Sequence, residues 1–256
     1  MRHALFAALF ALLLPCTSAV ALDQAKVAAV TKAADAFALL AADSEKTGKV
    51  PRETDAAAKP LLDTVFDTTV LEKGGVQPMS ELNNVNAWNM AVLKIGLVYM
   101  LAGTGAKEIG ALPQTPEAMA RVDGNTITFA PEVGRYLDAQ LRLQMAIIAT
   151  VQDFIRTATR AQLDNPNVKS GIGKIRGGTA QTISGAVSTL ALRDQTDDWR
   201  RARLTVLEVM APKAAPFLVA EERQALRAAF TETAAQMQAA DVKARMQKLG
   251  EAFGLP

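Results

Sequence analysis

The sequence predicts an all-α protein: one helical-bundle-like domain of about seven or eight helices over residues 22–256, with no significant sheet. Aromatic residues make up only 5% of the chain. Runs that alternate apolar and polar residues, as strands do, are few, and most apolar residues recur three or four positions apart, as on one face of a helix. The connections have lengths typical of bundles. The expected helices cover residues 23–45, 53–73, 80–101, 131–163, 167–192, 197–210, 219–239 and 241–253.

The first two helices end at glycines. Residues 23–45 place apolar side chains on one face, and Gly48 ends that helix. Residues 53–73 form the second helix, which ends at Gly74. Pro60 lies inside this second range, so the helix is expected either to kink there or to begin there.

The third helix, residues 80–101, is expected to be the central one. Its second half is apolar on every face and has Lys94 as its only charge, which indicates a buried helix rather than a membrane span. Asn86 and Asn89 fall on its apolar line, where buried amides need partners. We therefore expect a structural amide network there, with a polar ligand site in the bundle centre as the alternative. Lys94 is expected to reach the rim or to pair with a carboxylate, and a chemical role as a buried amine is its alternative.

The region between residues 103 and 129 is predicted to be mostly irregular. Residues 103–113 read as a loop, followed by a short helical turn at 116–122. Thr126–Phe129 combines β-propensity with a preceding Asp-Gly-Asn turn signal, so a short extended segment is expected at 126–129.

The helices at 131–163 and 167–192 are predicted to be antiparallel neighbours, because the connection between them is short. The second of them is rich in glycine, and each glycine in a helix costs roughly 1 kcal/mol relative to alanine. The simplest compensation is close approach of a neighbouring helix along this small-residue stripe. The glycines are at positions 171, 173, 177, 178 and 185.

The same stretch suggests an alternative, a small-anion site. Ser170, Lys174 and Arg176 lie near the start of this helix, where backbone N–H groups and two cations could hold an anion. The phosphate-binding spacing G-x-x-x-x-G-K-[ST] is absent, and no strand precedes the segment. Close helix packing with both cations solvated is therefore the preferred interpretation.

Three helices complete the chain. Thr196 or Asp197 is expected to cap the helix that runs to about residue 210, with acidic residues in its first turn. A break bounded by prolines is predicted at residues 211–216. The ranges 219–239 and 241–253 then carry apolar residues at helical spacing.

The N-terminus reads as a secretory signal peptide over residues 1–21. A basic start precedes the apolar run at residues 4–14, and Ala19-Val20-Ala21 is a typical cleavage site. The apolar run is too short to span a membrane. The alternative is lipid attachment at Cys16, for which Pro15 is a poor neighbour. We expect a mature protein that begins at Leu22, is periplasmic or secreted, and has no transmembrane segment after cleavage.

Cleavage after residue 21 would remove the only histidine and the only cysteine. Disulfides, cysteine nucleophiles, Cys/His zinc sites, histidine-ligated haem and histidine-based triads are then excluded. Without Arg2 the formal charge falls from +2 to +1, which gives no field to attract nucleic acid.

The predicted function is a non-enzymatic binding or structural role in the periplasm, for an unknown protein partner or small ligand and without a cofactor. The alternative is an enzyme or anion-binding protein that uses lysine, arginine and carboxylate groups. The candidate ligand-binding residues are Ser170, Lys174, Arg176, Asn86, Asn89 and Lys94. No metal ligands and no catalytic residues are predicted.

Overall fold

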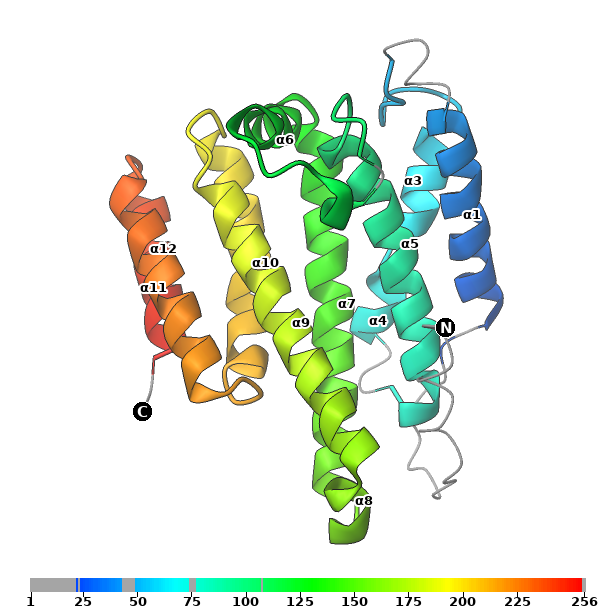
Figure 1. The fold of residues 1–256 in the computed structure, drawn as a ribbon, viewed down its shortest axis with the longest axis vertical. Helices are drawn as coiled ribbons and strands as arrows, with labels where there is room; N and C mark the ends of the chain where they lie inside the picture. Colours follow the sequence, from blue (N-terminus) through cyan, green and yellow to red (C-terminus); the bar gives the residue numbers. More distant parts are fainter. Residues whose placement is uncertain (1–21, 23, 43–48, 74–76, 107, 255–256) are drawn as a thin grey trace.

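A computed structural model describes residue 22 and residues 24–42, 49–73, 77–106 and 108–254 (Figure 1). This part of the chain is helical and contains no strand, which confirms the predicted all-α class. The helices run along a common direction in an elongated bundle, with α6 lying across one end. The predicted signal peptide, residues 1–21, lies outside the described residues.

The first half of the bundle contains α1 (Gln24–Ala42), α3 (Lys59–Phe66), α4 (Thr69–Lys73) and α5 (Leu82–Met100), with the 3₁₀ turn η2 (Met79–Glu81) before α5. The predicted helix at 53–73 is thus two shorter helices. The first begins beside Pro60, as one of the two expectations had it.

Asp67 separates these two short helices. Its Oδ1 accepts hydrogen bonds from the Thr69 backbone N–H at 3.3 Å and from the Thr69 hydroxyl at 2.5 Å. A short acidic side chain that accepts from the next N–H group starts a new helix, because it satisfies a donor that has no partner within the helix. Helices α1 and α5 are parallel neighbours: Lys94 pairs with Asp35 at 2.7 Å, and Tyr99 packs on Phe37.

The segment before α7 corrects the sequence-based expectation. After η3 (Ile109–Ala111), α6 extends from Pro116 to Thr128, so the predicted extended segment at 126–129 is wrong. Thr115 caps α6 by accepting from the Ala118 N–H at 3.2 Å. The Asn125 side chain donates to the carbonyls at the end of α5, which holds this last turn in place. These contacts override the local β-propensity.

Helix α7 (Ala130–Thr157) ends earlier than predicted because Thr159 caps a separate short helix, α8 (Arg160–Asp164). Thr159 and Gln162 form a capping box there. Helix α9 (Pro166–Leu190) then runs antiparallel to α7, as expected from the short connection, and Gln144 of α7 donates to Thr179 of α9 at 2.6 Å.

The C-terminal part consists of α10 (Asp197–Ala214), α11 (Ala220–Gln236) and α12 (Ala240–Ala252). Thr196 caps α10 by accepting from the Trp199 N–H at 3.2 Å. The predicted break at 211–216 begins too early, because α10 continues through Pro212 to Ala214.

The central helix is α7, not the one predicted at 80–101. Helix α7 buries side chains on several faces and packs against α5, α6, α9 and α10. Helix α5 has an open face, on which Met90 is 54% exposed. None of the helices that the structure describes has the length and apolar composition that a membrane crossing requires.

Candidate functional site

The glycines of α9 do not admit a neighbouring helix of this chain. A Cβ atom built at any of these five positions has no described atom within 4 Å, apart from its chain neighbours and the helix's own backbone. The expected close crossing is therefore wrong: the core face of α9 packs on α7 and α11 through larger side chains, and the glycines lie elsewhere. These positions are 171, 173, 177, 178 and 185.

Other glycines do allow close packing. At Gly96 of α5, a Cβ atom would lie 2.4 Å from the Tyr136 ring of α7. At Gly134 of α7, it would lie 2.2 Å from Nη1 of Arg203 and 3.0 Å from the indole nitrogen of Trp199. Close packing thus occurs at isolated glycines such as these, and at none of the five glycines of α9.

The side of α9 that points away from the core forms a surface almost without side chains, which we call the α9 outer face. At 100° per residue its members fall on one side of the helix. All of them are exposed except Gly177, which is half-buried. Over about 27 Å of helix axis, only a lysine and a glutamine on this face are larger than serine. The α9 outer face consists of Ser170, Gly173, Lys174, Gly177, Gln181, Ser184, Gly185 and Ser188.

The structure does not bring the predicted anion-binding residues together. Ser170 and Lys174 belong to the α9 outer face, but Arg176 is on the opposite side of the helix. The Arg176 guanidinium donates to the Phe217 carbonyl at 2.8 Å and lies over the Phe217 ring. The helix also begins well before these residues, at Pro166, and Asn165 caps it by accepting from the Asn167 N–H. The free N–H groups of its first turn are therefore remote from Lys174.

The polar residues singled out on α5 do not form one buried network. Asn86 is exposed, whereas Asn89 is half-buried and its Oδ1 has no hydrogen-bond partner among the described residues. Lys94 is 47% exposed and pairs with Asp35. The expectation that Lys94 pairs with a carboxylate is confirmed, and its side chain is not the buried amine of the alternative.

Two ion pairs on α7 were not predicted. Glu132 is fully buried, and its Oε1 accepts from Arg52 Nε at 2.9 Å and from the Glu53 backbone N–H at 3.0 Å. Burial and the nearby Glu132 carboxylate raise the pKa of the Tyr99 phenol above its usual range. Arg52 and Glu132 are 80 residues apart, so no local pattern signals their pairing.

The second pair joins α7 to α10. Asp138 accepts from Arg203 at 2.5 Å, and the Arg203 guanidinium lies over the Trp199 ring. Trp199 in turn donates its indole N–H to the Ala130 carbonyl at 2.8 Å. Burial raises the pKa of the Asp138 carboxyl, and the Arg203 charge opposes that rise. This cluster is closely packed and holds two helices together.

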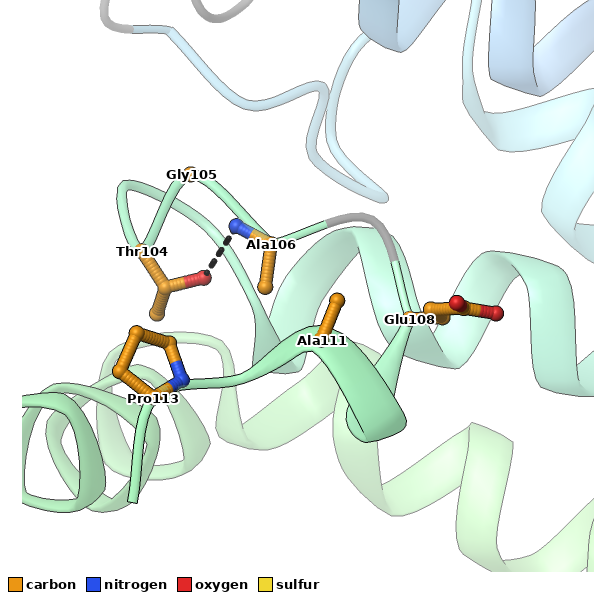
Figure 2. Close-up of a pocket in the computed structure, with 6 residues that line it drawn as sticks. All are labelled: Thr104, Gly105, Ala106, Glu108, Ala111 and Pro113. Carbon is orange, nitrogen blue, oxygen red and sulfur yellow. Dashed lines mark hydrogen bonds between the residues drawn. The ribbon is translucent and has the colours of Figure 1, made fainter. Parts of the chain in front are cut away.

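A hollow of about 470 Å³ lies in the loop before α6 (Figure 2). Thr104 is one of its polar side chains, and its hydroxyl is already bonded to the Leu101 carbonyl and the Ala106 N–H. Glu108 is exposed and points outward in Figure 2. A single solvated carboxylate beside an open loop is not a set of groups that could bind and orient a ligand. The lining residues are Thr104, Gly105, Ala106, Glu108, Ala111 and Pro113.

No protein-family model, curated protein or solved structure matches this chain. Within the described residues, no three acidic, histidine or cysteine side chains gather as a metal site would require. The α9 outer face is the candidate functional surface because it is long, exposed and nearly without large side chains, and it includes Ser170 and Lys174 from the sequence-based set.

Proposed function

We propose that this is an exported, non-enzymatic binding protein, and that it docks an acidic α-helix of a partner protein on the α9 outer face. The observation that carries the proposal is the cost of the three glycines on this face, Gly173, Gly177 and Gly185. At about 0.8–1 kcal/mol each relative to alanine, they lower stability by about 2–3 kcal/mol. That is a large share of the 5–15 kcal/mol by which domains are typically stable. No described atom outside the helix backbone and the chain neighbours lies within 4 Å of a Cβ at these positions, so the glycines gain no close contact in return.

A partner helix would supply the compensation. Without side chains in the way, its backbone can approach the α9 backbone more closely than in ordinary helix packing, as glycine permits. Helix recognition along an extended face is a recurring binding mode.

The charge of α9 favours an acidic partner. Residues 166–192 contain Lys169, Lys174 and Arg176 but no aspartate or glutamate. Lys169 is paired with Asp164, and Arg176 is bonded to a carbonyl of its own chain. Lys174 is exposed and has no ion pair with a described residue. A carboxylate on the docked helix would pair with Lys174 and fix its register.

The docking proposal is tested by carbodiimide cross-linking, which joins a lysine amine to a carboxylate in direct contact. The protein is incubated with an extract of exported proteins from its own cell, and cross-linked peptides are mapped by mass spectrometry. We expect a cross-link from Lys174 to a helical segment of another protein, lost in Gly177→Leu, where the new side chain blocks close approach. Gly124→Leu is the matched control, because Gly124 is also an exposed helical glycine without neighbours within 4 Å.

Two results would contradict this. One is equal cross-linking of the wild type and Gly177→Leu, and the other is a cross-link from Lys174 only to a second copy of this chain. Export is tested separately by the N-terminal residue of the purified protein. We expect Leu22, following cleavage after Ala21, and an acylated Cys16 at the N-terminus would refute the soluble form.

A further inference from the structure

Residues 50–58, between α1 and α3, form a short cover over one end of the bundle (Figure 1). This segment has its own turns. The Asp55 N–H donates to the Arg52 carbonyl at 2.9 Å, the Ala58 N–H donates to the Asp55 carbonyl at 3.0 Å, and the Asp55 carboxylate accepts from the Arg52 N–H at 2.7 Å. The cover therefore keeps its internal hydrogen bonds whether or not it contacts the bundle.

Few polar contacts hold the cover to the bundle. Glu132 accepts from both Arg52 Nε and the Glu53 N–H, and the Tyr99 hydroxyl donates to the Pro51 carbonyl at 2.9 Å. The Arg52 guanidinium lies 5.0 Å from the centre of the Phe129 ring. Arg135 of α7 adds a 3.7 Å pair with Glu53, so four residues of the bundle make polar or ring contacts with the cover, and Ala58 is fully buried where the cover joins α3.

Glu132 makes the strongest of these contacts, because it accepts two hydrogen bonds from the cover. Its own burial, however, favours opening. Its side chain is fully buried, yet Oε2 has no hydrogen-bond donor among the described residues. A buried carboxylate with an unsatisfied oxygen carries a desolvation cost. Opening of the cover would expose that oxygen to water. Its hydration would then offset part of the free energy lost with the broken contacts.

We propose that residues 50–58 open and close as one unit over the Tyr99–Phe129 aromatic pair, and that Glu132 is the positioning residue that latches the cover shut. The paired rings, with centroids 5.4 Å apart, are both buried in the closed form. Opening uncovers them at the end of the bundle, apart from the α9 outer face. A local opening of this kind breaks only local contacts and leaves the rest of the fold intact.

The test is hydrogen exchange of the full chain, followed at the Glu53 amide by overlapping peptides. Glu132→Gln removes the charge that holds Arg52, and Arg52→Ala removes the donor from a surface residue without emptying the core. We expect each variant to speed exchange at this amide by about tenfold or more, since hydrogen bonds to charged groups are worth such a factor. Exchange in α9 should stay at the wild-type rate.

Glu53→Ala is the matched control, because it keeps the backbone N–H that Glu132 binds and removes only a side chain in a 3.7 Å pair with Arg135. It should exchange like the wild type. The proposal is overturned by an unchanged Glu53 amide in both latch variants. It is equally overturned if exchange rises by the same factor in every helix, or if the control opens as far as Glu132→Gln.

Discussion

Alanine should shift the melting temperature in opposite directions at Gly96 and at Gly177, although both glycines lie inside helices. At Gly96 the new methyl group would lie 2.4 Å from Cδ2 and 2.7 Å from Cγ of Tyr136. Carbon atoms in contact normally lie about 3.5–4.0 Å apart, so the buried ring must move by about 1 Å. At Gly177 the methyl group would meet no described atom within 4 Å.

The magnitudes follow from these contacts. Overpacking against a buried ring costs up to about 3 kcal/mol, and the gain in helix propensity returns about 1 kcal/mol. Gly96→Ala should therefore lose about 2 kcal/mol, which lowers the melting temperature by about 4–8 °C for a domain of this size. Gly177→Ala keeps the propensity gain alone, so its melting temperature should rise by about 2–4 °C.

Differential scanning calorimetry of the wild type and the two variants in one buffer measures both shifts. Gly124→Ala serves as the control, because it is an exposed helical position with no neighbour within 4 Å and should follow Gly177→Ala. A fall in melting temperature for Gly177→Ala would show that α9 is packed at this position, and would remove the main support for the docking face. A rise for Gly96→Ala would show that the Tyr136 ring yields to the methyl group without loss of stability.

Two further predictions concern ion pairs. Gly134→Ala should push Arg203 away from Asp138 and destabilise the fold by about 1–3 kcal/mol. Urea unfolding measures this change. Wild-type stability in the variant would show that the ion pair adapts to the new methyl group without loss. The Arg201 guanidinium lowers the pKa of Asp241 from 3.8 to about 2. A lowered carboxyl pKa stabilises the fold above the unfolded value and loses that effect as the pH falls through the folded value. Between pH 5 and pH 2, the melting temperature should therefore fall less steeply with decreasing pH for Arg201→Gln than for the wild type. Identical slopes of melting temperature against pH would exclude a contribution from this pair.

The sequence was sufficient for the features that depend on local chemistry. The short connection before Pro166 predicted the antiparallel pair of α7 and α9, and Thr196 was one of the two residues expected to cap the helix that became α10. Helical periodicity predicted α9 itself, but it could not show which of its faces are covered, because that depends on where other helices pack. The glycines were therefore assigned to a crossing that the fold does not contain.

Long-range contacts explain the remaining differences. Residues 126–129 have β-propensity, but Asn125 donates to the carbonyls of Met100 and Ala102, more than 20 positions away, and α6 continues through Thr128. The pairing of Arg52 with Glu132 and that of Arg203 with Asp138 join segments 80 and 65 positions apart. In each case the partner is fixed by the fold, so the residue type alone gave no indication of it.

The parallel neighbours in this bundle have a consequence for the order of folding. Asp35 on α1 and Lys94 on α5 are 59 positions apart, and Ala130 and Trp199, which join α7 to α10, are 69 positions apart. A parallel pair requires the chain to travel the length of the bundle and back before the second helix can dock. Closing such long loops costs entropy before any contact is gained, and folding rates fall as contacts become less local. The antiparallel pair of α7 and α9 should therefore form early, with α1 and α10 docking late onto apolar surfaces that stay exposed until then.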